Sequence, residues 1–263
     1  MSDATTTAPA HGAPPRADCV ADSAGGITFD LVVVEAAQPV LVLRRRGGSG
    51  GPSDETRLPL TPASEGHLRA VLPSTMELAE GRWDVYLDER AVEPGIRDLR
   101  ALVDRVPDEE GGVAVRVPYP TADGRLAVRS WTRMPHAEAG DIHFGEGACT
   151  VEGTLHGVRL GDGAMAEARL GGKVRTVPAD GEKGSFSFTL AYDTLAEPPV
   201  AAEQLWELWL RPEADAEPVR ISRVLDDVWD RKNVFVYPVH QGEGYKAAPC
   251  YTTDNDLCVR VTK

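Results

Sequence analysis

The chain has few cysteines, and none of them has zinc-binding spacing. Its four cysteines are Cys19, Cys149, Cys250 and Cys258, and no two of them form a C-x-x-C pair. Structural zinc sites are usually built from such pairs, so we expect none here. Cys250 and Cys258 flank a predicted hairpin turn that would place them opposite each other. In a reducing compartment we expect them to act as small apolar fillers.

Long apolar runs are also missing. No stretch reaches the roughly 20 apolar residues that a membrane-spanning helix needs. The N-terminus has no basic region followed by an apolar core, so it does not resemble a secretory signal. Residues 1–24 begin with a segment rich in Ala, Thr and Pro, which is typical of disorder. We therefore expect a disordered tail over 1–24, a cytoplasmic location and no membrane partner.

Positive charge is scarce. The chain carries 28 Lys and Arg against 41 Asp and Glu, a formal net charge of −13. Nucleic acids and anionic membranes are bound by clustered Lys and Arg. The one basic run, Arg44–Arg46, is short and lies at a predicted strand end. We expect no nucleic-acid partner, and the acidity is explained most simply by solubility.

Familiar catalytic motifs are absent. The sequence contains no G-x-S-x-G, no P-loop, no G-x-G-x-x-G ahead of a helix and no H-E-x-x-H. Its six histidines are scattered, without a pair at metal-binding spacing. Acidic groups near Asp226 and Asp254 suit turns and caps better than a cation site. The sequence thus predicts no catalytic residue, no metal and no cofactor, and favours a protein that is not an enzyme.

An internal repeat is present. P-T-A-D-G-R-L-A-V-R over 120–129 aligns without a gap to Y-T-T-D-N-D-L-C-V-R over 251–260. W-D-V-Y-L over 83–87 matches W-E-L-W-L over 206–210. A period of about half the chain is too long for a solenoid unit and has the size of a small domain. We interpret it as the tandem duplication of one domain.

The hydrophobic pattern is that of strands. Short β-branched and alternating segments recur along the chain, separated by polar turns, which favours a β-sandwich or barrel. Asp123–Gly124 is a hairpin signal, and Asp254–Asn255 stands at the matching place. The predicted fold class is all-β, with two tandem Ig-like β-sandwich domains. The predicted domains cover residues 25–133 and 136–263.

Aromatic residues supply the candidate site. In a strand over 83–87, Trp83 faces the core, and Trp206 does so in the repeat. Tyr86 and Trp209 then lie on the other face beside carboxylates. Such a face suits a sugar platform, or an interface between sheets or between copies of the chain. We keep both interpretations, and a homo-oligomer is the partner that the second one implies.

The second half also carries an insertion, Tyr237 to Ala248, that has almost no counterpart in the first. Because the fold does not require it, an added loop on a repeated scaffold is a good place for specialised function. It holds His240 and Tyr245, and Trp229 lies shortly before it. The predicted ligand-binding residues are Trp209, Trp229, Tyr237, His240, Tyr245 and Tyr86.

At the two repeated hairpin segments the chain resembles β-sandwich modules attached to actinobacterial cell-wall glycosyltransferases and CDP-glycerol glycerophosphotransferases. Those modules have a similar hairpin, with a Thr, a small turn residue and an apolar strand that ends in a basic residue. We expect no nucleotide-sugar domain beside the sandwiches. The resemblance implies an accessory module that binds glycan, or that mediates oligomerisation, for a transferase.

From these observations we expect a non-catalytic accessory protein that binds a carbohydrate or a glycosyltransferase partner during polymer or glycan assembly. The alternative is a small transferase or cyclase of a secondary pathway with its site between the domains. Convergence of His240, Lys246 and acidic residues in one closed pocket would favour the enzyme.

Overall fold

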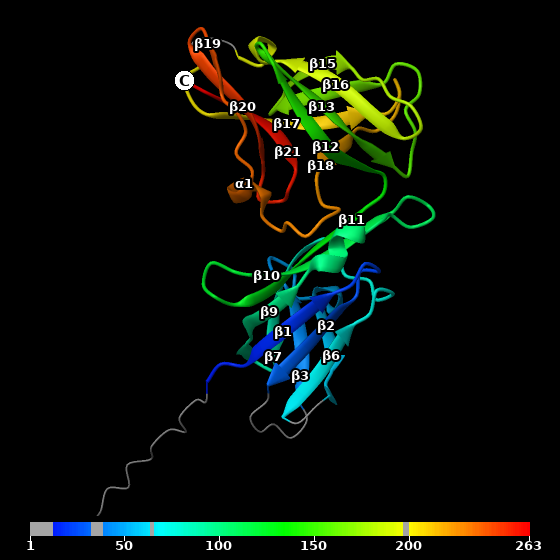
Figure 1. Cartoon of the computed structure of the whole chain (residues 1–263), viewed down its shortest axis with the longest axis vertical. Coiled ribbons are helices and arrows are strands. Elements are labelled where there is room, and N and C mark those ends of the chain that lie inside the picture. The colour runs from blue at the N-terminus through cyan, green and yellow to red at the C-terminus, as the bar shows by residue number, and fades with distance from the viewer. Residues whose placement is uncertain (1–12, 33–38, 64–65, 197–199) are drawn as a thin grey trace, which may run out of the picture. The chain divides into compact units, whose positions relative to one another are not determined.

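The computed structural model describes residues 13–32, 39–63, 66–196 and 200–263 (Figure 1). The chain divides into two compact units. Unit 1 takes residues up to Leu99 together with Pro118–Ser130, and unit 2 takes Arg100–Val117 together with Trp131–Lys263. Strands make up most of both units. The all-β prediction is therefore confirmed.

Unit 1 is built around two sheets. In the first, β1, β2 and β6 lie side by side (blue to cyan in Figure 1), and the order is β5-β6-β2-β1-β9. In the second, the order is β10-β11-β7-β3-β4, with β8 beside β7. The strands are β1 Arg16–Ala21, β2 Ile27–Val32, β3 Val40–Arg45, β4 Glu55–Pro59, β5 Thr61–Pro62, β6 His67–Leu72, β7 Gly81–Leu87, β8 Arg90–Ala91, β9 Glu93–Asp98, β10 Val113–Pro120 and β11 Leu126–Arg133. Residues 113–117 of β10 and 131–133 of β11 cluster with unit 2.

Unit 2 pairs its strands in the order β16-β13-β12-β18-β17-β21-β20-β19, and β14 joins β17 to β15. The short helices of the chain are η1 Pro52–Asp54, η2 Arg100–Asp104, η3 Tyr192–Thr194 and α1 Arg231–Val234. The strands of unit 2 are β12 His136–Gly145, β13 Ala148–His156, β14 Met165–Leu170, β15 Lys173–Pro178, β16 Ser185–Ala191, β17 Gln204–Arg211, β18 Val219–Ser222, β19 His240–Gly242, β20 Tyr245–Tyr251 and β21 Leu257–Thr262.

The same pairing order runs through both units. The series β6-β2-β1-β9 of unit 1 corresponds to β16-β13-β12-β18 of unit 2, and β10-β11-β7-β3-β4 corresponds to β20-β21-β17-β14-β15. The pairs β1–β9 and β12–β18 are parallel. The pairs β1–β2 and β3–β7 of unit 1, and β12–β13 and β17–β21 of unit 2, are antiparallel. Each strand of unit 2 from β12 to β18 therefore has a positional equivalent in unit 1.

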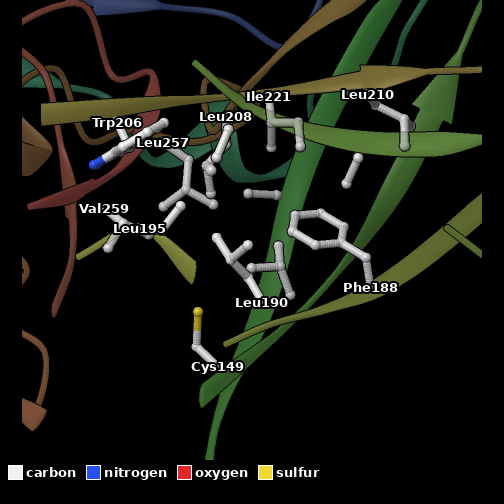
Figure 2. Close-up of a cluster of buried hydrophobic side chains, with 14 of the residues drawn as sticks. Cys149, Phe188, Leu190, Leu195, Trp206, Leu208, Leu210, Ile221, Leu257 and Val259 are labelled. Atoms are coloured by element: carbon white, nitrogen blue, oxygen red, sulfur yellow. The ribbon is translucent and has the colours of Figure 1, made fainter. Parts of the chain in front are cut away.

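Each unit centres on a buried tryptophan. Trp83 of β7 and Trp206 of β17 are both 1% exposed. Their predicted positions in the core are confirmed. In unit 2 Trp206 belongs to an apolar cluster with Phe188, Leu208 and Leu257 (Figure 2). Alternation along β7 and β17 creates these cores because every second side chain points to the same face.

The repeated hairpins close in the same way. Gly124 N–H donates to Thr121 O at 3.0 Å, and Asn255 N–H donates to Thr252 O at 3.2 Å. Gly124 has φ +77° and Asn255 has φ +60°. Both turns need the left-handed backbone that Gly adopts freely and Asn tolerates. The hairpin predictions at these two places are confirmed.

Two boundaries differ from prediction. The predicted tail over 1–24 includes β1, in which Ala17, Cys19 and Ala21 are buried; residues 1–12 lie outside the described residues. These side chains are small, so their alternation gives a weak strand signal. Residues 100–117, predicted within the first domain, cluster with unit 2. There the backbone at Gly111 meets Gly157 so closely that a Cβ on Gly111 would lie 2.2 Å from Gly157 N.

Candidate functional site

The main addition in unit 2 is the connection between β18 and β20, residues 223–244, which contains α1 and β19. Glu138 of β12 holds the first residues of this connection. This carboxylate accepts hydrogen bonds from Val224 N–H at 2.9 Å, Leu225 N–H at 3.0 Å and His136 Nε2 at 2.7 Å. A charged acceptor on two consecutive amides fixes the direction in which the chain leaves β18.

Arg231 anchors the middle of this connection. Its side chain is fully buried, its Nε donates to Arg223 O at 2.9 Å, and its guanidinium pairs with Asp226. It also lies over the rings of Phe235 at 4.9 Å and Tyr251 at 5.6 Å. Burial lowers the pKa of Arg231 to about 10. Burial removes the hydration of the guanidinium, and the hydrogen bond, the ion pair and the aromatic rings together compensate for that loss.

Asn255 in the β20–β21 turn holds the same segment. Its Oδ1 accepts from Arg231 N–H at 3.0 Å, and its Nδ2 donates to Val228 O at 2.8 Å. The side chain is fully buried. The turn residue thus closes the hairpin with its backbone and supports the connection with its amide group.

Between this connection and the strands β20 and β21 lies a groove of about 160 Å³. Lys232, Lys246 and Arg260 contribute three cations to its lining, which contains no carboxylate. Across the described chain Lys232 and Lys246 make no ion pair, and Arg260 reaches Glu203 only at 3.6 Å. We call it the cationic groove. Phe235, Tyr237 and Cys250 add apolar surface to it.

Tyr237 is the predicted ligand residue that lines the cationic groove. Its ring packs near Phe144 at 5.8 Å and Tyr251 at 6.2 Å between centroids. The hydroxyl groups of Tyr237 and Tyr251 are 3.5 Å apart. The ring is therefore held by aromatic neighbours.

His240 and Tyr245 lie together on the β19–β20 hairpin. Their ring centroids are 6.0 Å apart, and His240 also stacks on Tyr192 at 5.5 Å. Tyr245 lines a second hollow of about 640 Å³ together with Asp193, Glu243 and Lys263. Burial and Asp193 raise the pKa of Tyr245. Because this hollow carries two carboxylates, it offers no selection for an anion.

Trp209 has a different environment. Arg169 lies over its ring at 4.9 Å and Arg220 at 4.8 Å, and these residues come from strands on the two sides of β17. Glu167, only 3% exposed, accepts hydrogen bonds from Arg169 and from Arg211. Two guanidinium groups over the indole occupy the surface that a sugar ring would need.

The other two predicted residues are also outside the groove lining. Tyr86 lies in unit 1, with Arg44 over its ring at 5.0 Å. Trp229 is half-buried in the β18–β20 connection. The sequence reasoning missed Lys232, Phe235 and Arg260 as groove residues. Lys246 and Arg260 belong to paired strands and point to the same face, a relation that appears only once the register of β20 and β21 is known.

His240, Lys246 and acidic residues do not converge in one pocket. Lys246 lines the cationic groove, while His240 packs on Tyr192. Within the described ranges no three His, Cys, Asp or Glu side chains are close enough to hold a metal ion. In the same part of the chain no helix is long and apolar enough to cross a membrane.

No protein-family model matches the chain, and no curated protein matches it. Among solved structures, S. aureus TarS aligns over 66% of this chain and 34% of its own, with 14% identity and a TM-score of 0.29. A TarS fragment covering 217–571 aligns over 68% and 56%, with 15% identity and a TM-score of 0.30. The chain spans about a third of the first TarS chain.

A pullulanase from Anoxybacillus sp. LM18-11, complexed with maltotriose, aligns over 77% of this chain and 24% of its own, with 12% identity and a TM-score of 0.26. Every one of these TM-scores is far below 0.5, so the function has to be argued from the groove itself.

Proposed function

We propose that the chain is a non-catalytic, cytoplasmic accessory protein of polymer or glycan assembly, made of two Ig-like β-sandwiches that arose by duplication. Its second unit binds carbohydrate that carries acidic groups, in the cationic groove. The shared strand order of the two units supports the duplication. The observation that carries the function is a groove lined by three cations and no carboxylate in a chain of net charge −13.

The chemistry of the groove fits such a ligand. Lys232, Lys246 and Arg260 suit a phosphate or carboxylate, because charge-assisted hydrogen bonds are the strong ones. The rings of Phe235 and Tyr237 provide apolar surface for the C–H groups of a sugar or polyol. The sequence analysis predicted a sugar platform that includes Trp209. The unpaired lysines favour an acidic sugar in the groove.

Titration calorimetry tests this with acidic oligosaccharides, such as oligogalacturonates, against maltotriose as the neutral control. We expect measurable binding of the acidic ligand only, weakened by added salt. Lys232→Ala and Lys246→Ala should each reduce affinity roughly tenfold, since one charge-assisted hydrogen bond is worth about 1.5–3 kcal/mol. Lys263→Ala, in the second hollow, is the matched control and should bind as the wild type does. Equal binding of neutral and acidic ligands would refute the proposal.

A glycosyltransferase partner is the second candidate, favoured by exposed valines on the same connection. Val234, Val236 and Val239 are 63%, 88% and 53% exposed. Apolar side chains left in water side by side are typical of a protein-binding surface. Val234→Asp, at a position outside the lining of the cationic groove, should abolish association with such a partner and leave acidic oligosaccharide binding unchanged.

A further inference from the structure

Cys250 and Cys258 are direct partners across the β20–β21 pair. The side chains flanking Cys250 in the alternation, at Pro249 and Tyr251, are buried, so Cys250 points to the opposite, outer face of the sheet. Paired antiparallel residues have Cα atoms about 4.5–5.5 Å apart. Disulfides span Cα separations of about 4.4–6.8 Å, so these two residues lie within the Cα range that a disulfide bridges.

The two thiols differ in access. Cys250 is half-buried and lines the cationic groove, whereas Cys258 is fully buried. A reagent in solution therefore reaches Cys250 first and Cys258 only through it. Both are free thiols in this structure.

Burial raises the pKa of Cys250, partly opposed by Arg260, and burial also raises the pKa of Cys258. The thiolate is the attacking species, so the reaction of this pair is slow at neutral pH and accelerates as pH rises. The charged and titratable groups that act on Cys250 are Arg260, Glu203 and Lys232, and those that act on Cys258 are Cys250, Arg220, Asp256 and Glu207.

The other two cysteines have no sulfur opposite them. Cys19 of β1 pairs with Phe29 and Arg97, and Cys149 of β13 pairs with Phe144 and Leu190. Both are buried. They are internal controls for any thiol reaction of the folded chain.

We infer that Cys250 and Cys258 form a reversible cross-strand disulfide through exchange with a low-molecular-weight disulfide such as oxidised glutathione. The Cys250 thiolate attacks one glutathione sulfur, the glutathione S–S bond breaks, and one glutathione leaves as a thiolate that takes up a proton. The Cys258 thiolate then attacks the Cys250 sulfur and releases the second glutathione. In total two protein thiols lose two electrons and two protons, and one glutathione disulfide becomes two thiols.

The bond would change the cationic groove, because it turns the Cys250 sulfur toward β21. Formation of the Cys250–Cys258 disulfide does not depend on which ligand the cationic groove binds. Its test therefore measures only the thiols. A disulfide at this place would make the wall of the groove responsive to the redox state of its surroundings.

The test is incubation of the reduced full chain with oxidised glutathione, followed by thiol counting and peptide mass spectrometry. We expect two of the four thiols to disappear together, the protein to lose two hydrogen atoms in mass, and a Cys250–Cys258 peptide to appear. The rate should rise up to about tenfold per pH unit below the thiol pKa. Excess reduced glutathione should restore both thiols.

Variants separate the steps. Cys258→Ser should stop with one glutathione on Cys250, and Cys250→Ser should leave Cys258 unreacted. Circular dichroism checks that each variant folds, and the alanine variants replace any that does not. Wild-type protein that keeps four thiols, stops at the same mixed disulfide as Cys258→Ser, or cross-links Cys19 or Cys149 would overturn the proposal.

Discussion

The hairpin turns at Gly124 in unit 1 and Asn255 in unit 2 have the same backbone, yet only the second supports another segment. A Cβ at Gly124 would meet nothing within 4 Å. Asn255 instead uses its amide group to hold Arg231 and Val228. The comparison teaches that one turn geometry, present in both units, leaves the side chain at this position open to different tasks. In unit 2 the Asn255 amide positions the wall of the cationic groove.

The residues opposite Tyr86 and Trp209 also differ between the two units. Val42, 1% exposed, lies opposite Tyr86 in unit 1, and Glu167, 3% exposed, lies opposite Trp209 in unit 2. An apolar contact in one unit is thus an ion-pair centre in the other. At these positions unit 1 has apolar packing and unit 2 has polar interactions.

The largest effect should come from the shared core. Trp83→Ala and Trp206→Ala should each cost roughly 3–5 kcal/mol, because each removes a fully buried aromatic. Hydrogen exchange followed by mass spectrometry should show lost protection in β3, β7 and β11 for the first and in β14, β17 and β21 for the second. A difference of more than about 2 kcal/mol between the two variants would break the equivalence of the cores.

The turn exchange gives the next effect. Asn255→Gly keeps a residue that accepts positive φ but removes two hydrogen bonds to the connection, at a cost of about 1–2 kcal/mol. Exchange over residues 223–235 should accelerate. The reciprocal change, Gly124→Asn in unit 1, is the control and should cost less than about 1 kcal/mol, since the new side chain meets only open space. Equal costs for both changes would show that the amide of Asn255 has no special role.

Much of the fold was predictable because its signals are local. Alternation over 83–87 placed Trp83 in the core, and the turn chemistry of Asp254–Asn255 located a hairpin. The site was harder because it depends on relations across strands. The face of Trp209 followed from its own strand, but the arginines over its ring come from β14 and β18. Lys232 joins the groove only through the fold of the connection, which Arg231 determines.

The smallest effect concerns the outer aromatics. A double-mutant cycle of Arg169→Ala with Trp209→Ala should give a coupling of about 0.5–1 kcal/mol, the range of cation–π pairs at partly exposed sites. The equivalent cycle in unit 1, Arg44→Ala with Tyr86→Ala, should give a smaller value, because Trp is the better partner for a cation. Denaturant unfolding measures both cycles.

The same residue also distinguishes the two interpretations of the outer face. Trp209 has a guanidinium over its ring from each neighbouring strand, so it is already engaged within the unit. Trp209→Phe should then leave the affinity for acidic oligosaccharides within about twofold of wild type, while Lys246→Ala lowers it roughly tenfold. The opposite pattern would show that the ligand binds at the aromatic face of Trp209 and not in the cationic groove. Couplings of zero between Trp209 and both Arg169 and Arg220 would free the indole for that role, because neither guanidinium would then compete with a sugar for its surface.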